Sequence, residues 1–366
     1  MGKEVLIMFL TFKILKLVGK ILGLVLGPIL LLALLFFGYL CITEYSPDER
    51  EAVAVTSPQQ ALTSPSVGES FTVYSWNIGY SGLGEESDFF MDGGEMVDPP
   101  SQEAVEKNFA GILNFMQNTE ADAWLLQEVD RDSSRSDGMD QYAALSEKIP
   151  SASSFALNYK CAFVPFPLPP IGGVESGLAT LSARNLAQDA TRVSLPCPFS
   201  WPVRVAQLKR CLLINRIPLA DSDKQIVLVN LHLEAYDDGE GKIAQTKLLL
   251  QVLEEEYAKG NYVIAGGDFN QLFPGTEALY PIAEPEKWLP GQLEASQLPE
   301  GWQFAFDAAT PTCRLLDRPY TEDCQKYVID GFLVSPNVTV STVKTQDLGF
   351  RFSDHNPVAL TVTFAP

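Results

Sequence analysis

The chain has 366 residues, of which 46% are hydrophobic and 20% are charged, so it can bury a substantial core and has a globular composition. Its formal net charge is −20, and residues 1–40 contribute +3 (four lysines against one glutamate), so the remainder carries −20 − 3 = −23. Such an acidic domain repels long polyanions, which disfavours a nucleic-acid-binding protein unless metal ions or a local basic groove intervene.

The N-terminal region contains the first predicted element, a membrane span. Residues 21–42 carry no charge, and these 22 residues exceed the length of about 20 that crosses a bilayer. Lysines precede the segment and acidic residues follow it, so the positive-inside rule predicts a basic cytoplasmic segment over 1–20, a transmembrane anchor over 21–42 and an extracytoplasmic domain. A cleaved signal peptide, which would leave the domain secreted, is the alternative, although its apolar core usually spans only about 7–15 residues.

Residues 43–70 are polar and rich in Ser, Pro and Ala, which is typical of a linker. Residues 71–366 show neither an internal repeat nor a second linker, so we expect one domain there. Amphipathic periodicity predicts helices over 101–119 and 241–260, and apolar runs predict strands between the loops. Because several consecutive strands lack an intervening helix, the pattern predicts an α/β fold with mixed sheets and outer helices.

Six cysteines are present, one at the membrane edge and five in the domain. Disulfides are permitted outside the cytoplasm, and Cys313 and Cys324 bracket a short loop, so they are the best candidate pair. An odd number in the domain leaves at least one cysteine unpaired or paired elsewhere.

Polar residues end six of the predicted apolar strands, where a rigid frame can present them to a cleft. Each alone has an ordinary explanation, such as a turn residue or a satisfied strand histidine. Those explanations do not account for all six positions together, including the only two histidines of the chain. The residues are Asn77, Gln127, Glu128, Asn230, His232, Asp268, Asn270, Asp330, Asp354 and His355.

The order of these motifs resembles that of the endonuclease/exonuclease/phosphatase superfamily, whose fold is that of deoxyribonuclease I. The motifs are Trp-Asn, Gln-Glu, Asn-x-His, Gly-Asp-Phe-Asn, an Asp before a strand, and Ser-Asp-His, and together they are specific. The resemblance implies a four-layered α/β sandwich with two mixed β-sheets flanked by helices, here preceded by one N-terminal transmembrane helix. It also implies metal-dependent hydrolysis of a phosphate ester.

The resemblance and the chemistry of ester hydrolysis together suggest a metal site. Carboxylate and amide oxygens suit Mg²⁺, with Mn²⁺ or Ca²⁺ as alternatives. The expected ligands are Asn77, Glu128 and Asp354.

The same resemblance suggests the catalytic groups. His355 is the expected general base, with Asp330 orienting its ring and stabilising the imidazolium. His232 would donate to the phosphate or to the leaving oxygen. Asp268 and Asn270 would orient water and bind the developing phosphorane.

The substrate is less well defined, because the motifs do not distinguish lipid, inositol phosphate, nucleotide and nucleic acid. The acidic charge disfavours a long polyanion, and a membrane anchor concentrates lipid head groups, so we expect a phosphodiesterase or phosphatase acting outside the cytoplasm on a small or lipid phosphoester. A membrane-anchored endonuclease or exonuclease is the first alternative, and a non-catalytic binding module on the same fold is the second. Candidate substrate contacts are Asn158, Lys160 and Asn230, and no protein partner can be inferred.

One part of the surface is a candidate for lipid contact. The Pro-rich loop 163–177 contains Phe163 and Phe166, and Phe199 to Trp201 follow nearby in the sequence. Ordinary loop packing is the commoner role of such residues.

Overall fold

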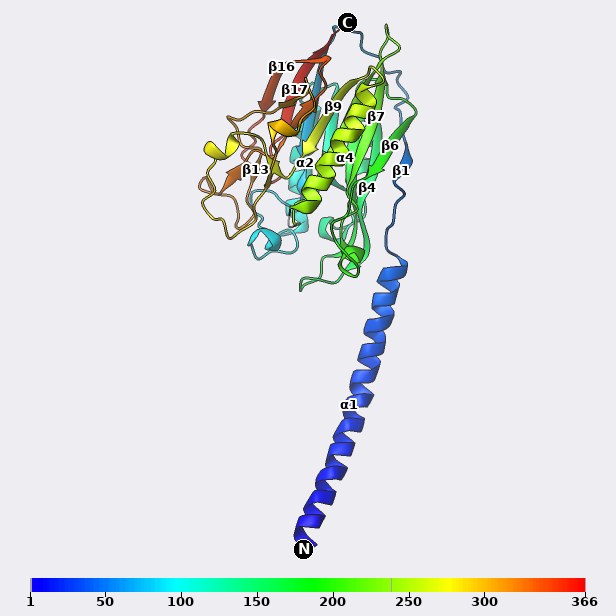
Figure 1. Cartoon of the computed structure of the whole chain (residues 1–366), viewed down its shortest axis with the longest axis vertical. Coiled ribbons are helices and arrows are strands. Elements are labelled where there is room, and N and C mark those ends of the chain that lie inside the picture. Colours follow the sequence, from blue (N-terminus) through cyan, green and yellow to red (C-terminus); the bar gives the residue numbers. More distant parts are fainter. Residues whose placement is uncertain (1, 238, 366) are drawn as a thin grey trace. The chain divides into compact units, whose positions relative to one another are not determined.

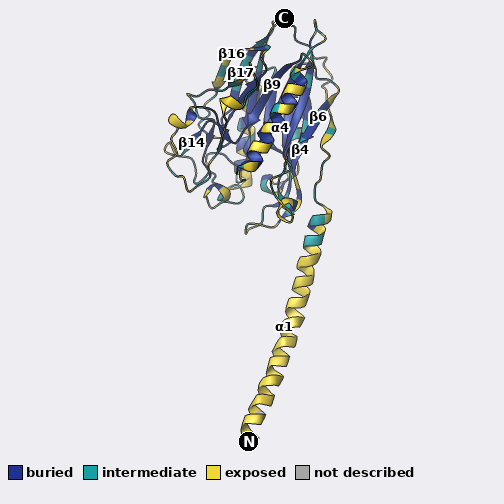
Figure 2. Ribbon diagram, in the orientation of Figure 1, coloured by how far each residue is buried: buried dark blue, intermediate teal, exposed yellow. Residues whose placement is uncertain are grey.

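The computed structural model describes residues 2–237 and 239–365, which divide into two compact units with the boundary between Glu44 and Tyr45 (Figure 1). The first unit is one helix, α1 (Gly2–Ile42), whose most apolar stretch has no buried residue (Figure 2). By length and composition α1 could cross a membrane, and a signal sequence near an N-terminus would have the same properties. The helix includes residues 2–20 of the predicted basic segment, whereas residue 1 lies outside the described residues.

Two mixed β-sheets form the second unit, together with two short two-stranded sheets. The seven-stranded sheet has the order β1-β6-β7-β8-β9-β15-β12, and the six-stranded sheet has the order β16-β17-β2-β3-β5-β4. The strands of the seven-stranded sheet are β1 (Arg50–Ala54), β6 (Asp189–Ser194), β7 (Cys211–Pro218), β8 (Gln225–His232), β9 (Tyr262–Asp268), β12 (Gln303–Ala305) and β15 (Asp330–Val334). Those of the six-stranded sheet are β2 (Ser70–Asn77), β3 (Ala123–Asp130), β4 (Ala152–Val164), β5 (Gly172–Ser182), β16 (Val338–Thr345) and β17 (Val358–Phe364). The short strands are β10 (Gln271–Leu272), β11 (Gly291–Gln292), β13 (Cys313–Arg314) and β14 (Lys326–Tyr327).

Helices cover the outer face of each large sheet. On the six-stranded sheet lie α2 (Gln102–Gln117) and α3 (Gln141–Lys148), and on the seven-stranded sheet lies α4 (Glu240–Tyr257). Ser101 caps α2 by accepting a hydrogen bond from the Ala104 amide at 3.1 Å. The short 3₁₀ turns are η1 (Gly79–Ser81), η2 (Phe90–Asp92), η3 (Ser134–Ser136), η4 (Val203–Ala206), η5 (Thr276–Ala278) and η6 (Ala295–Gln297).

Three layers of apolar side chains hold the sandwich together. One core lies between the sheets and includes Phe71, Leu125 and Leu228. The other two lie under the helices, one beneath α4 and one beneath α2 and α3. The unit is therefore a helix–sheet–sheet–helix sandwich, the four-layered fold expected.

Residues 45–70, expected to belong to a linker, are part of the second unit. Within them β1 pairs antiparallel with β6, Arg50 opposite Val193 and Ala54 opposite Asp189. Val53 and Val55 pack on a small cluster that contains Cys211. The strand escaped prediction because five residues among polar neighbours show too little alternation; its stability comes from pairing with β6.

The predicted Cys313–Cys324 disulfide is wrong for this structure, in which both cysteines are free. Cys313 lies in β13, close to His355, whereas the Cys324 sulfur accepts a hydrogen bond from the Thr321 amide at 3.3 Å. Proximity in sequence suggested the pair, but the two side chains have separate environments.

Candidate active site

Side-chain alternation directs the polar strand ends into the space between the two sheets. In β8, Ile226 and Leu228 pack in the inner core, so Asn230 and His232 point into the same space. Alternation along β2, β3 and β9 directs three further candidate residues inward: Asn77, Gln127 and Asp268.

Strand pairing sets the order of these side chains at one end of the sandwich. β8 is parallel to β9 with His232 opposite Asp268, and β15 is antiparallel to β9 with Asp330 opposite Asp268. In the other sheet Asn77 lies opposite Gln127. The carboxyl ends of β8 and β9 therefore meet the amino end of β15.

Glu128 reaches the same site through a β-bulge. It follows the inward-facing Gln127, so a regular strand would turn it outward. The pairing of β3 with β5 shifts between Leu126 and Val129, and Glu128 adopts a φ of 52°. Such bulges re-aim side chains, and a positive φ costs a non-glycine residue about 1–3 kcal/mol. The Glu128 carboxylate consequently accepts a hydrogen bond from Asn77 Nδ2 at 3.1 Å.

His355 and Asp330 form a buried pair, with His355 Nδ1 2.8 Å from Asp330 Oδ2. The backbone around His355 is fixed by two further contacts. Trp76 Nε1 donates to the His355 carbonyl at 2.9 Å, and the His355 amide donates to Ser353 Oγ at 3.1 Å. One ring nitrogen is thus committed to Asp330, and Nε2 remains available for proton transfer.

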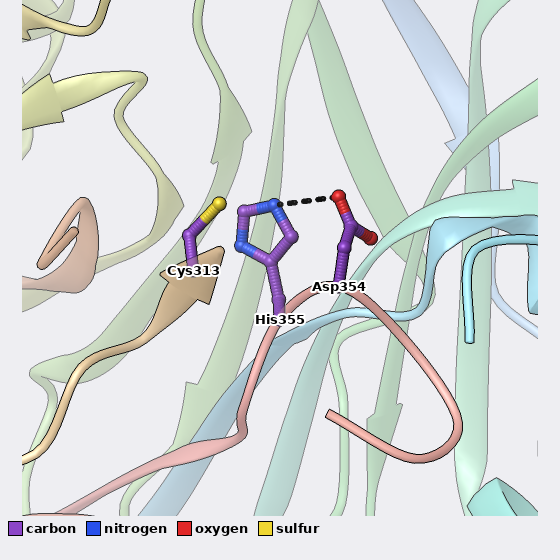
Figure 3. A group of neighbouring side chains, drawn as sticks. All are labelled: Cys313, Asp354 and His355. Atoms are coloured by element: carbon purple, nitrogen blue, oxygen red, sulfur yellow. Dashed lines mark ion pairs between the residues drawn. The ribbon is translucent and has the colours of Figure 1, made fainter. Parts of the chain in front are cut away.

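The other side of the His355 ring is shown in Figure 3. The ring lies between the thiol of Cys313 and the carboxylate of Asp354, whose Oδ2 is 3.7 Å from Nε2. Burial raises the pKa of the Cys313 thiol to about 12, so it remains protonated beside the histidine.

The carboxylate of Asp268 is the meeting point of the site. Its Oδ2 accepts a hydrogen bond from Asn77 Nδ2 at 3.1 Å, and it lies 3.5 Å from His232 Nε2 and 3.8 Å from His355 Nε2. Burial raises the pKa of Asp268 to about 7; His355 opposes this shift and the neighbouring Asp330 carboxylate adds to it.

The two histidines have opposite protonation preferences. Burial lowers the pKa of His232 well below its usual value, and the Arg210 guanidinium adds to this effect. Burial acts on His355 in the same direction, but the carboxylates of Asp330, Asp354 and Asp268 outweigh it and raise the pKa of His355 well above its usual value.

The acidic residues Glu128 and Asp354 have the chemistry of a divalent-cation site. Burial raises the pKa of Asp354 to about 6, and the nearby Glu128 carboxylate adds to the shift although His355 opposes it. A hard cation between two carboxylates would remove this repulsion. Gly79 allows the Asp354 carboxylate to lie close to the backbone, since a Cβ there would lie 2.9 Å from Asp354 Oδ1. These residues therefore fit a metal ion.

Among the described residues, two groups of three potential ligand atoms are compact enough to hold an ion, Cys313–Asp354–His355 and Asp268–Asp330–His355. Both include His355, whose Nδ1 is already bonded to Asp330. We therefore favour Glu128 and Asp354 as the metal-binding pair.

Asn77, the third predicted ligand, uses both ends of its amide in hydrogen bonds within the protein. Its Nδ2 donates to Glu128 and Asp268, both at 3.1 Å, while its Oδ1 accepts the Gly79 N–H at 3.0 Å. In this orientation Asn77 positions the carboxylates of Glu128 and Asp268.

The remaining predicted residues divide into those at the pocket and those away from it. Asn158 and Asn270 line the pocket, and Asn270 Nδ2 donates to the Leu233 carbonyl at 2.9 Å. Asn230 is fully buried and bonds to Gln127 and to the carbonyls of Leu126 and Ala179, so it ties the two sheets together away from the pocket. Lys160 is not among the pocket residues, and it pairs with Glu175 at 2.9 Å.

Several pocket residues had no signal in the sequence because they come from loops and short 3₁₀ turns. The Arg135 guanidinium carbon lies 3.7 Å from the centre of the Tyr80 ring, and Arg135 Nη2 lies 2.9 Å from Asp130 Oδ1. Asp92 accepts a hydrogen bond from the Tyr236 hydroxyl at 2.9 Å.

All the predicted catalytic and metal-binding residues except Asp330 line one pocket with a cavity volume of about 490 Å³. Its polar floor contains Asn77, Glu128, His232, Asp268, Asn270, Asp354 and His355. Its walls are largely apolar and aromatic.

Two stacked mixed sheets, with a histidine–aspartate pair and clustered carboxylates at one end, define a phosphoester hydrolase of the deoxyribonuclease I-like class. The endonuclease/exonuclease/phosphatase family model matches residues 74–355, and the chain belongs to this family, whose members are metal-dependent.

Two solved structures illustrate the shared fold. An endonuclease/exonuclease/phosphatase from Beutenbergia cavernae DSM 12333 has a TM-score of 0.56 and 19% identity, covering 81% of this chain and 72% of that chain. The Bacteroides vulgatus endonuclease/exonuclease/phosphatase has a TM-score of 0.52 and 17% identity, covering 81% of this chain and 99% of that one. No curated protein matches the sequence significantly.

Proposed function

We propose that this protein is a Mg²⁺-dependent phosphodiesterase or phosphatase that acts outside the cytoplasm on a small or lipid phosphoester. The observation that supports this most directly is the convergence of His232, Asp268 and His355 beside Glu128 and Asp354 in one pocket. These are the general acid–base groups and hard ligands that hydrolysis of a phosphate ester requires.

Glu128 and Asp354 would hold the cation. Mg²⁺ is proposed because it binds through few carboxylates and retains water, and Mn²⁺ or Ca²⁺ are the alternatives. When bound, the cation would offset the charge of the phosphate and part of the negative field around His355.

The chain's own residues would move the protons. His355, with Nδ1 bonded to Asp330, would accept a proton from water at Nε2 as the general base. Asp268, 3.8 Å from that nitrogen, would orient the water, and Asn270 would bind the developing phosphorane. His232, which remains neutral, would donate a hydrogen bond to the phosphate or to the leaving oxygen.

The proposed location depends on α1. Lysines before the uncharged segment and acidic residues after it favour a cytoplasmic N-terminus and an extracytoplasmic domain. Cleavage of the same segment would release a secreted enzyme. A membrane-bound domain would meet lipid head groups at high local concentration.

The test is an assay of the purified full chain in detergent with Mg²⁺. Bis(p-nitrophenyl) phosphate, sphingomyelin, inositol phosphates and plasmid DNA would serve as substrates, with His355→Ala as the control. We expect ester hydrolysis that EDTA abolishes and that His355→Ala lowers strongly. Turnover that persists in EDTA or in His355→Ala would overturn the mechanism, and plasmid DNA as the preferred substrate would identify a nuclease.

A further inference from the structure

An apolar rim lies at the mouth of the pocket. We define it by four residues on two loops: Phe166 (72% exposed), Leu168 (83%), Trp201 (57%) and Val203 (54%). Phe166 and Val203 also line the pocket. Large apolar side chains exposed together on a folded domain mark an interaction surface.

The two loops of the rim form one structural feature. The loop after β4 and the segment around η4 pack together through a cluster that joins Val164 and Ile171 to Ala206 and Leu208. The Tyr159 hydroxyl donates to the Ala206 carbonyl at 3.0 Å, which ties the base of one loop to the other. In Figure 1 the loop after β4 extends beyond the ends of the strands.

The rim is uncharged on a strongly acidic protein. Residues 163–171 and 196–203 contain no Asp, Glu, Lys or Arg, whereas the whole chain has a net charge of −20. An uncharged tip with a tryptophan, a phenylalanine and a leucine has the composition of segments that enter the bilayer interface.

Apolar surface continues from the rim into the pocket. Val164, Ile171 and Leu208 line the wall next to Phe166, and the same cavity reaches Asp268 and His355. A molecule that enters over the rim would therefore contact apolar side chains before its phosphate reached the catalytic groups.

We propose that the apolar rim docks on a lipid bilayer and that the substrate is a phospholipid taken directly from it. This inference rests on the proposed function and narrows the substrate to a lipid phosphoester. A protein partner seated on the rim would cover the mouth of the pocket, whereas a bilayer would supply the substrate there. An uncleaved α1, which by length and composition could cross a membrane, would also keep the domain near lipid.

Tryptophan fluorescence provides a direct test. The full chain would be reconstituted in phosphatidylcholine vesicles containing brominated phosphatidylcholine, which quenches nearby indoles. None of the five tryptophans lies in α1, and Trp201 is the one among them with an exposed side chain. We expect quenching in the wild type and its loss in Trp201→Phe.

Leu168→Asp tests docking without removing the probe. Leu168 does not line the pocket, and its high exposure means that the substitution leaves the core intact. Loss of one leucine that would be buried in the bilayer weakens docking by roughly tenfold to a hundredfold, and the added charge weakens it further. The matched control is Leu279→Asp, a 57% exposed leucine outside the rim, which should leave quenching unchanged.

Activity separates this inference from the proposed function. We expect Leu168→Asp to lower hydrolysis of vesicle phospholipid by about tenfold or more, while hydrolysis of bis(p-nitrophenyl) phosphate stays within about twofold. Absence of bromolipid quenching in the wild type, or equal quenching in Leu168→Asp, would overturn docking. If the wild type hydrolysed neither the soluble ester nor vesicle phospholipid, the proposed function would fail, and quenching would still decide whether the rim docks.

Discussion

Asp330 is a single residue whose effect on proton transfer can be isolated, because it bonds His355 without lining the pocket. Asp330→Asn keeps the shape of the side chain but replaces the acceptor that holds the Nδ1 proton. We expect kcat for bis(p-nitrophenyl) phosphate to fall by roughly a hundredfold or more with KM little changed, since the ring loses its tautomer control.

The pH–rate profile provides the check on this prediction. A positioning role requires the limb attributed to His355 to shift in Asp330→Asn, and melting followed by circular dichroism should show that the fold persists. A uniform fall in rate with an unchanged pH profile would indicate structural damage instead.

Glu128 combines a functional carboxylate with a strained backbone, which allows two effects to be separated. Both Glu128→Gln and Glu128→Asn remove the charge, so both should abolish metal-dependent turnover. Asn tolerates a positive φ better than Gln, and we therefore expect the Asn variant to be more stable than the Gln variant by about 1 kcal/mol.

Urea unfolding in EDTA measures this difference, and titration with Mn²⁺ measures metal binding. Equal stability of the two variants would argue against backbone strain at Glu128, and Mn²⁺ affinity like that of the wild type would argue against its role as a ligand.

Residues that obey strand alternation could be anticipated from the sequence, and those that break it could not. Asn77, His232 and Asp268 end apolar strands, so both their existence and their common direction follow from the pattern. The bulge that turns Glu128 inward has no sequence signal, and the family motif alone pointed to it. Asn230 points to the same side of β8 as His232 but lies deeper between the sheets, where its amide bonds to residues of the other sheet.

At the scale of elements, β1 illustrates how a strand can depend on its neighbour. Val53 points into the cluster around Cys211, whereas Ala52 is exposed on the other side of β1. We expect Val53→Asp to lower the free energy of unfolding by about 1–3 kcal/mol, because the substitution places a charge against apolar side chains.

Ala52→Asp is the matched control, and surface substitutions of this kind stay within about 0.5 kcal/mol. Urea denaturation of the full chain in detergent would measure both variants. Equal stability would mean that β1 is dispensable, as expected of the linker that the polar sequence suggested.

At the scale of the whole molecule, the fold could be predicted from the sequence because its layers follow from periodicity and from the order of the motifs. Helical periodicity predicted α2 and α4, and apolar runs between loops predicted the central strands. The pocket walls could not be predicted from the sequence, because loops such as those carrying Asp92 and Arg135 show no periodicity. Their positions depend on the assembled sheets.

The net charge of the whole molecule makes a prediction that discriminates between lipid and nucleic-acid substrates. The two arginines among the described pocket residues are both paired, Arg135 with Asp130 and Arg210 with Glu234, so the pocket contains no basic groove to offset a charge of −20.

Added salt screens repulsion over a Debye length of about 10 Å at 0.1 M. Any cleavage of duplex DNA should therefore increase as NaCl is raised at constant Mg²⁺, while hydrolysis of zwitterionic phospholipid should change little. Proteins that bind DNA through phosphate contacts show the opposite dependence, losing affinity steeply with salt. Measurement of kcat/KM for both substrates at several NaCl concentrations would decide: a steep fall in DNA cleavage with salt, joined to efficient cleavage at low salt, would favour the nuclease.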